Sequence, residues 1–226
     1  MNEVIIACDF KNKNDLEQFL EKFGTEKPFL KIGMELFYKE GPHYVKELKE
    51  RGYKIFLDLK LHDIPTTVYK AMKNLVLLDV DITNIHAAGG IQMMKMAKLA
   101  VDESKSKMKL IAVTQLTSID EDTMKKELLI KSSMEDTVLH YGLNAKKANL
   151  DGVVCSAYEA TIMKEIGLIS VTPGIRFAEN EKDDQARVCT PQMAKEFGST
   201  YIVVGRAITA SENPVQAYLK SVKEFC

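Results

Sequence analysis

Asp58, Lys60 and Asp63 stand where an apolar stretch, residues 54–57, gives way to a proline that can begin a helix. Alternate side chains of an extended segment share a face, so we expect the Asp58 carboxylate and the Lys60 ammonium group to lie side by side. Desolvating such a pair at the end of an apolar strand is costly, and apolar residues there are often at least as stabilising. The pair therefore indicates a reaction centre, although this motif alone would fit a structural salt bridge equally well.

Two further charged residues, Asp9 and Lys31, occupy similar positions in the chain. Asp9 follows the apolar residues 4–8, and Lys31 lies near the end of the apolar residues 29–32. If these runs are parallel strands of one barrel, their carboxyl ends lie at the same rim, where such barrels carry their active sites. Because several charges would meet there, we favour catalysis over a structural salt bridge.

A second group of residues has the character of a phosphate site. Gly205 and Arg206 follow the apolar residues 201–204, and a segment with Pro173 and Arg176 follows another apolar run. A glycine lets the backbone approach a ligand, and arginine offers a planar fork of donors to phosphate. Gly-Arg alone could simply turn the chain, but the two segments together predict a phosphate site.

The polar segment 176–189 lies between these two segments in the sequence, and we interpret it as a lid loop that closes over a ligand. Its acidic half is expected to be solvated. Gln185 is one of its residues able to donate hydrogen bonds inward.

Short apolar runs alternate with longer amphipathic stretches along the whole chain, which is typical of βα units. The predicted strands are residues 4–8, 29–32, 54–59, 82–85, 109–113, 152–155, 168–171 and 201–204. The predicted helices lie near residues 14–23, 41–51, 66–78, 90–104, 133–148, 157–165, 191–197 and 214–224. We predict an α/β fold, a (β/α)8 TIM barrel that forms one domain over residues 1–226, because a chain of roughly 200–250 residues suits such a barrel. A doubly wound open sheet is the alternative.

The composition is that of an ordinary globular enzyme, with 46% hydrophobic residues, 28% charged residues and a formal net charge of −1. This balance gives no indication of a nucleic-acid polymer or a membrane as partner. The four cysteines form no CxxC pair, so we expect reduced thiols and a cytoplasmic location. The N-terminal residues are predicted to form a first strand rather than a signal peptide. The histidines show no spacing typical of metal ligands, so we predict no metal site.

Four segments together closely resemble the orotidine 5′-phosphate decarboxylase family of the bacterial type. They are Asp58-Leu59-Lys60-Leu61-His62-Asp63-Ile64-Pro65, His86-Ala87-Ala88-Gly89-Gly90, Thr172-Pro173-Gly174-Ile175-Arg176 and Val204-Gly205-Arg206. The similarity spans the whole chain in the expected order. It implies a (β/α)8 barrel that converts orotidine 5′-monophosphate to UMP and CO2 in pyrimidine biosynthesis, without a cofactor or a metal.

The resemblance also implies roles for individual residues. Lys60 would protonate C6 of the pyrimidine as CO2 leaves, and Asp58 would lie against the substrate carboxylate. Lys31 and Asp63 would complete the charged network, and Asp9 and Lys31 would hold the ribose hydroxyls.

The remaining contacts that the resemblance implies concern the base, the phosphate and a second subunit. Thr117 would contact the pyrimidine. The residues expected around the phosphate and the closing loop are Pro173, Arg176, Gln185, Gly205 and Arg206. Asp63 and Thr67 would reach into the site of a partner subunit, which implies a homodimer.

Two other functions remain open from the sequence. A sister lyase that acts on a sugar phosphate carries a similar Asp-x-Lys-x-x-Asp signature but resembles enzymes that require Mg2+. The second alternative function is that of a non-catalytic barrel that binds a nucleotide phosphate as a sensor. A scaffold is disfavoured, because it has no need for so many charged strand ends.

Overall fold

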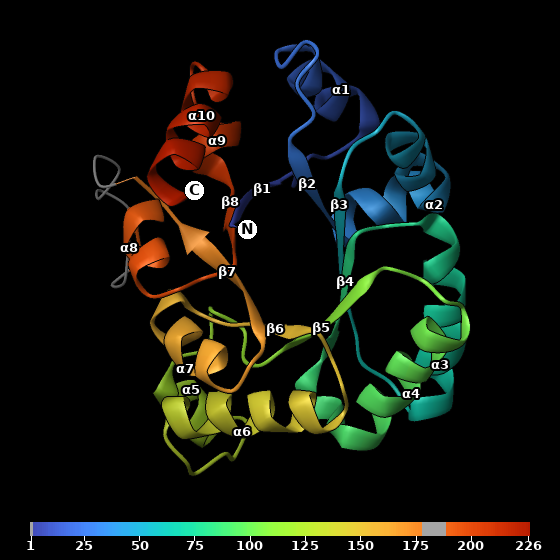
Figure 1. Ribbon diagram of the computed structural model, residues 1–226, viewed down its shortest axis with the longest axis vertical. Coiled ribbons are helices and arrows are strands. Elements are labelled where there is room, and N and C mark those ends of the chain that lie inside the picture. The colour runs from blue at the N-terminus through green and yellow to red at the C-terminus, as the bar shows by residue number, and fades with distance from the viewer. Residues whose placement is uncertain (1, 178–188) are drawn as a thin grey trace.

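The computed structural model describes residues 2–177 and 189–226. Within these ranges eight parallel strands close into a barrel in chain order, with β8 paired to β1. The helices surround the barrel, and the first strand lies beside the last (Figure 1). The predicted (β/α)8 barrel is confirmed, and the open-sheet alternative is wrong.

The strands are β1 (Glu3–Ala7), β2 (Phe29–Gly33), β3 (Ile55–Leu61), β4 (Ile82–His86), β5 (Lys109–Val113), β6 (Gly152–Val154), β7 (Ile169–Ile175) and β8 (Tyr201–Val204). The α-helices are α1 (Lys13–Glu21), α2 (Met34–Glu50), α3 (Pro65–Leu75), α4 (Gly90–Glu103), α5 (Glu121–Lys126), α6 (Met134–Lys147), α7 (Ala160–Glu165), α8 (Pro191–Glu196), α9 (Arg206–Thr209) and α10 (Pro214–Phe225). Short 3-10 turns are η1 (Val76–Leu78), η2 (Ala87–Gly89) and η3 (Ala157–Glu159).

The sequence prediction differs from these bounds in three helical regions. It omitted α5 and α9, which are short, and the first half of α2. The second half of α2 begins where expected, at Pro42, because Gly41 has φ 75° and ψ 179° and so interrupts the helix. Other helix starts follow their local signals: Pro191 and Pro214 each occupy the first turn of a helix.

The apolar side chains of the strands form two separate layers. One layer fills the inside of the barrel and consists of Ile5, Ala7, Phe29, Phe56, Ile82, Ile111, Val113, Val154, Val171, Tyr201 and Val203. The larger layer lies between the barrel and its helices. Since both faces of each strand are covered, the strands are apolar almost throughout, as the sequence pattern indicated.

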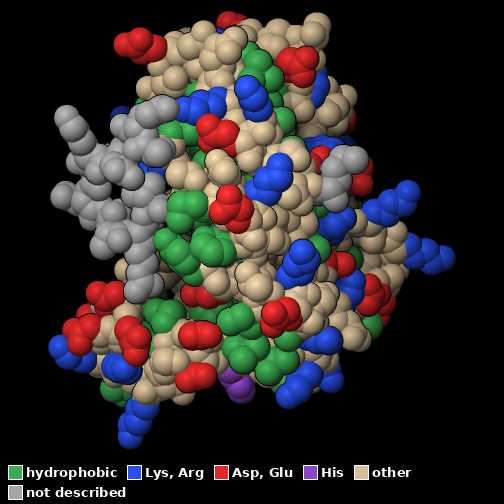
Figure 2. All heavy atoms as spheres, turned by 60° about the vertical axis from the view of Figure 1, so that its left-hand side comes forward, with side chains coloured by type: hydrophobic (Ala, Val, Ile, Leu, Met, Phe, Trp, Pro, Cys, Tyr) green, Lys and Arg blue, Asp and Glu red, His purple; other side chains and the backbone are tan. Residues whose placement is uncertain are grey.

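The surface carries both signs of charge. Figure 2 shows acidic and basic side chains interspersed on the face that it draws, in keeping with the near-zero net charge. Among the described residues, no helix combines the length and apolar character that crossing a membrane requires.

Candidate active site

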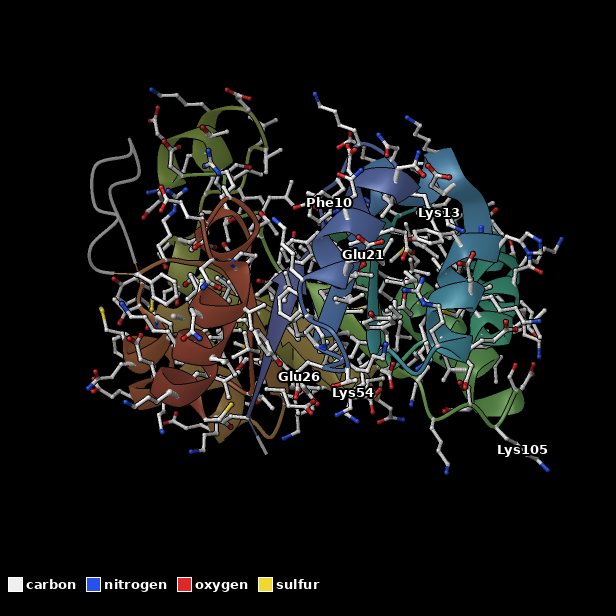
Figure 3. The ribbon with its side chains drawn as sticks, turned by 90° about the horizontal axis from the view of Figure 1, so that it is seen from above. Phe10, Lys13, Glu21, Glu26, Lys54 and Lys105 are labelled. Atoms are coloured by element: carbon white, nitrogen blue, oxygen red, sulfur yellow. The ribbon has the colours of Figure 1, made fainter. Side chains whose placement is uncertain are left out.

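The two ends of the barrel carry different sets of residues. Phe10, which follows β1, lies at one end, whereas Lys54, which precedes β3, lies at the opposite end (Figure 3). The end with Phe10 is therefore the carboxyl end of the strands. A cavity of about 150 Å³ involves residues at this end, and its lining is Lys31, Phe56, Asp58, Lys60, Val113, Gln115, Leu116, Thr117, Val154, Val171, Pro173 and Val203.

Four charged side chains, from β2, β3 and the segment that follows β1, form a continuous chain of ion pairs at this cavity. Lys31 Nζ lies 2.8 Å from Asp9 Oδ1 and 3.5 Å from Asp58 Oδ2. Lys60 Nζ lies 2.7 Å from Asp58 Oδ1, so the expected proximity of Asp58 and Lys60 is confirmed. Lys31 and Asp58 are buried, whereas the Asp9 side chain is 61% exposed. The network therefore runs from solvent into the barrel.

The charges at the centre of the network support one another's ionisation. Burial acts to raise the pKa of Asp58, but the positive charges of Lys31 and Lys60 outweigh burial and hold that pKa below its usual value. Burial likewise acts to lower the pKa of Lys31, and the carboxylates of Asp9 and Asp58 outweigh it, so that the pKa is raised. The ion pairs thus favour the charged form of both the buried Asp58 carboxylate and the buried Lys31 ammonium group.

A bulge in β3 brings the central ion pair, Asp58 and Lys60, into the cavity. Leu57 pairs with Thr83 and Leu61 pairs with Ile85, so four steps along β3 match only two along β4. Lys60 has a left-handed backbone with φ 51°. That conformation costs an L-residue roughly 1–2 kcal/mol, and bulges of this kind are frequent beside active sites. The simple alternation of a strand did not predict it.

A second irregularity occurs in β7, at the predicted phosphate site. Thr172 pairs with Ile202 and Ile175 pairs with Val204, which leaves one additional residue in β7, and Gly174 there has φ 80°. β8 lies beside β7 and ends just before Gly205. The two predicted phosphate segments are therefore neighbours in the barrel.

The two arginines of this edge come from adjacent strands. Arg206 is exposed at the first position of α9, and Arg176 is half-buried directly after β7. The Arg176 amide donates to the carbonyl of Cys189 at 3.0 Å, which joins the two ends of the segment that was predicted as a lid. Residues 178–188 of that segment, including Gln185, lie outside the described residues.

The remaining predicted residues lie at the same end of the barrel but differ in exposure. Thr117 and Pro173 line the cavity. Asp63 and Thr67 are exposed at the start of α3, and the Asp63 carboxylate accepts a hydrogen bond from the Ile64 amide at 2.6 Å. The structure brings Lys31, Asp58, Lys60 and Asp9 together, whereas the carboxylate of Asp63 makes its hydrogen bond to the backbone.

The sequence analysis missed two residues that shape the site. Asn84, in β4, is fully buried and bonds both members of the central ion pair. Gly33, at the end of β2, leaves room for the ion pair of Lys31 and Asp9, since an added Cβ would lie 3.1 Å from Asp9 Oδ1 and 3.3 Å from Lys31 Nζ. A polar residue within a buried strand was the available signal for Asn84.

Two histidines lie near the site but outside the cavity. The rings of His62 and His86 are 5.4 Å apart, and burial, followed by the proximity of His62, lowers the pKa of His86. Across the part of the chain that the structure describes, no three side chains of His, Cys, Asp or Glu gather as metal ligands would.

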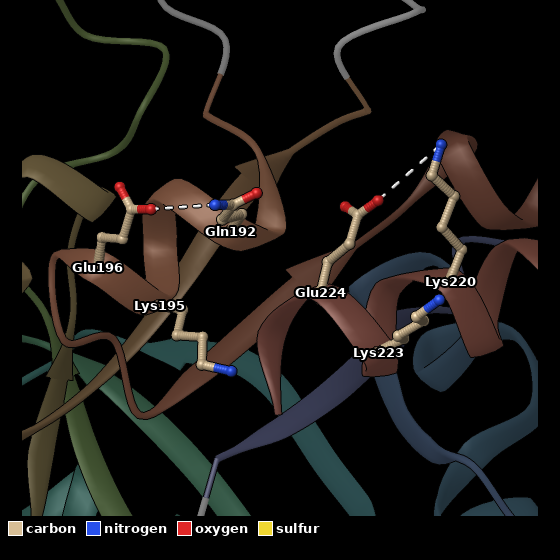
Figure 4. A pocket seen from close by; sticks show the side chains of 6 residues that line it. All are labelled: Gln192, Lys195, Glu196, Lys220, Lys223 and Glu224. Carbon is tan, nitrogen blue, oxygen red and sulfur yellow. Dashed lines mark hydrogen bonds and ion pairs between the residues drawn. The ribbon is translucent and has the colours of Figure 1, made fainter.

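A larger hollow of about 720 Å³ lies on the outside of the barrel between α8 and α10 (Figure 4). Its lining consists of Gln192, Lys195, Glu196, Lys220, Lys223 and Glu224. Gln192 donates to Glu196 at 3.2 Å, and Lys220 lies 4.0 Å from Glu224. The hollow is lined by side chains of two helix surfaces, each of which carries an interaction within its own helix, so we assign the candidate active site to the smaller cavity, where charges from several strands converge.

Comparison with known proteins places this site in a family. The model of the orotidine 5′-phosphate decarboxylase / HUMPS family matches residues 2–221. The chain therefore belongs to that family of barrel enzymes.

Individual relatives narrow the assignment. Orotidine 5′-phosphate decarboxylase of Bacillus cereus strain Q1 is 54% identical over 228 residues, which cover 98% of this chain and 95% of the relative. The crystal structure of orotidine 5′-phosphate decarboxylase from Lactobacillus acidophilus aligns over 100% of this chain and 99% of its own, with a TM-score of 0.89 and 43% identity. A Methanocaldococcus jannaschii enzyme crystallised with the inhibitor BMP has a TM-score of 0.79 at 21% identity over 100% of this chain and 99% of its own, and supports the fold alone.

These relatives define the activity as that of a carboxy-lyase, orotidine 5′-phosphate decarboxylation. The resemblance seen in the sequence is thereby confirmed. The sugar-phosphate lyase and the nucleotide sensor are not supported by relatives of this identity and coverage.

Proposed function

We propose that the cavity at the carboxyl end of the barrel removes the C6 carboxylate of orotidine 5′-monophosphate as CO2, and that Lys60 delivers the proton that replaces it. The observation that carries this proposal is the central ion pair: a buried carboxylate, Asp58, holds the ammonium group of Lys60 at 2.7 Å beside an otherwise largely apolar cavity. Loss of CO2 leaves an electron pair at C6, and a proton from Lys60 completes UMP.

The ammonium group of Lys60 stabilises the negative charge that develops at C6, which is the main barrier to this reaction. No electron sink in the pyrimidine accepts the developing charge at C6, so its stabilisation has to come from nearby positive charge. A preoriented charge in a site that excludes water stabilises a transition state more than it would in solution. The apolar side chains of Val113, Val154 and Val171 that line the cavity help to exclude water there.

Asp58 has two functions in this proposal. Its carboxylate orients Lys60, and it also faces the carboxylate of the substrate, so that repulsion is relieved when CO2 leaves. The second effect is a form of ground-state destabilisation. Lys31, 3.5 Å from Asp58, keeps the carboxylate charged while the substrate binds.

The rest of the substrate is held by residues around this centre. Asp9 and Lys31, joined at 2.8 Å near the mouth of the site, would bind the ribose hydroxyls. Thr117, which lines the cavity, would contact the pyrimidine, and Pro173, which also lines it, belongs to the segment beside the phosphate. Gln185 and Arg206 would bind the phosphate, Gly205 would allow its approach, and Arg176 would support the closing loop at the phosphate end. The binding energy of the phosphate would help to order the site.

We also propose that the active unit is a homodimer in which Asp63 and Thr67 complete the partner's site. Both residues are exposed in a single chain, and Ile64 between them is 64% exposed although it is apolar. Mixing Lys60→Ala with Asp63→Ala protein should restore activity at about a quarter of the sites, because in a mixed dimer one site has both residues intact. No gain on mixing would contradict the shared site.

The decisive experiment for the function is a single turnover. Enzyme in excess over orotidine 5′-monophosphate should remove the absorbance of the orotate ring and release one UMP per substrate. The same result in EDTA is expected, because the proposal assigns every step to side chains. Stoichiometric binding without a change in absorbance would contradict the proposal and favour a sensor.

A further inference from the structure

We infer that Asn84 is a positioning residue for decarboxylation: one uncharged amide fixes the relative geometry of Asp58 and Lys60. The inference rests on the proposed function, since it concerns the same site. The Asn84 side chain is fully buried in β4. Its Nδ2 donates to Asp58 Oδ1 at 2.7 Å, and its Oδ1 accepts the backbone N–H of Lys60 at 2.8 Å.

Asn84 contributes first to the backbone of Lys60. Between the pairs Leu57–Thr83 and Leu61–Ile85 the ladder of β3 and β4 is interrupted, and Lys60 lies in this interval with φ 51°. The amide oxygen of Asn84 supplies an acceptor to the Lys60 N–H there. Because an unpaired buried N–H is costly, this bond favours the left-handed conformation that aims Lys60 at the cavity.

Asn84 contributes second to the orientation of the Asp58 carboxylate. Asp58 Oδ1 accepts both from Lys60 Nζ and from Asn84 Nδ2, each at 2.7 Å, while Oδ2 faces Lys31 at 3.5 Å. The neighbours also fix the orientation of the amide. If it were flipped, its NH2 group would face the Lys60 N–H, and its oxygen would face the Asp58 carboxylate, so neither hydrogen bond could form.

Few side chains could replace Asn84 in this role. The position requires a donor and an acceptor on one short planar group, without a net charge. An aspartate would keep the acceptor for Lys60 but would place a second carboxylate against Asp58. An alanine would leave both bonds unmade. Since small displacements of reacting groups are costly in rate, either change should act mainly on kcat.

The first test compares Asn84→Ala with Thr83→Val. Thr83 is the neighbouring residue of β4, is equally buried, and donates to the Leu57 carbonyl at 3.0 Å, so this variant also loses a hydrogen bond between β3 and β4. We expect kcat of Asn84→Ala to fall at least roughly 10-fold with KM within about 3-fold of wild type. Thr83→Val should keep the wild-type kcat, although its stability in urea should fall about as much as that of Asn84→Ala. Equal effects on kcat in the two variants would overturn the inference.

The second test uses the charge of Asn84→Asp. Two carboxylates in contact tend to share a proton, and the protonated pair again contains a donor between its oxygens. The ratio of variant to wild-type kcat should therefore rise as the pH is lowered, whereas the same ratio for Asn84→Ala should stay flat. A flat ratio for Asn84→Asp would overturn the inference, because a merely structural role predicts no such dependence.

A third measurement does not depend on turnover. A crystal structure of Asn84→Ala should show Lys60 shifted from its left-handed φ, or its Nζ displaced from Asp58. An unchanged Lys60 backbone and an unchanged ion pair would overturn the inference. Failure of the wild-type protein to convert orotidine 5′-monophosphate would instead contradict the proposed function, so the two failures are distinguishable.

Discussion

The two ends of the barrel both carry buried or half-buried carboxylates, but these have different partners. At the amino end, Asp81 directly precedes β4 and accepts the Ile55 amide at 2.7 Å and Lys49 Nζ at 2.6 Å. Asp151 directly precedes β6 in the same way, accepts the Leu110 amide at 2.9 Å, and lies 3.8 Å from Lys98. Each of these carboxylates thus fixes the first residues of a neighbouring strand.

At the carboxyl end the charges are bonded mainly to one another. Asp58 is bonded to Lys60, Lys31 and Asn84, and all of these are side chains. The network lies at a cavity rather than at the start of a strand. The comparison indicates that Asp81 and Asp151, which each bind the backbone of a neighbouring strand, serve stability, whereas the side-chain network around Asp58 at the cavity serves chemistry.

The largest expected effect lies at the carboxyl end. Lys60→Ala should lower kcat at least about 1,000-fold, because it removes both the proton donor and the charge at C6. Affinity for UMP should change far less, as measured by calorimetry. Lys49→Ala, which removes the lysine of an ion pair at the other end, is the matched control and should retain kcat. Near-normal turnover in Lys60→Ala would contradict the mechanism.

Arg206→Ala should have the next largest effect. Loss of a charged hydrogen bond to phosphate costs about 2 kcal/mol, which is roughly 30-fold in KM. Steady-state kinetics measures this directly. Lys107→Ala removes an exposed cation just before β5, at the amino end, and should leave KM unchanged. A similar rise in KM for both variants would show that general charge, rather than the phosphate site, was responsible.

Asp81→Ala should reverse the pattern by reducing stability without reducing kcat. It leaves the Ile55 amide and Lys49 without their carboxylate, so we expect the free energy of unfolding to fall by about 2 kcal/mol. Urea denaturation measures the loss, and kcat per folded molecule should be unchanged. A fall in kcat with no loss of stability would remove the distinction between the two ends.

Asp151→Ala should have the same kind of effect but a smaller one. Its backbone bond is 2.9 Å and its lysine is more distant than that of Asp81. We expect a loss of about 1 kcal/mol in the same urea experiment. A loss larger than that of Asp81→Ala would mean that the ion-pair distance does not set the order.

The smallest expected effect is the contribution of Asp58 to acid sensitivity. Its pKa is lower in the folded than in the unfolded protein, so the stability that it adds is complete above the unfolded pKa of about 3.9 and is lost as the pH falls through the folded pKa. Asp58→Asn should therefore lose stability less steeply between about pH 5 and pH 2 in urea titrations. An equal slope in the two proteins would contradict the lowered pKa.

The sequence by itself determined the barrel and the position of its chemistry. Alternation of apolar runs with amphipathic stretches is a local property of the chain, and so is the place of Asp9, Lys31, Asp58 and Lys60 relative to the strands. Because parallel strands of a barrel end at one rim, these local facts were enough to predict that the charges meet. The residues of the phosphate edge followed from the same reasoning.

Only the tertiary structure decided how the charges are held. The left-handed backbone of Lys60 and the bulge around it depend on the register between β3 and β4, which closure of the whole barrel sets. Asn84 meets Lys60 across 24 positions of sequence for the same reason. The alternation of side chains along one strand does not tell which residues of the neighbouring strand lie beside them. For this reason the sequence predicted the ion pair of Asp58 and Lys60 but missed Asn84, whose amide positions it.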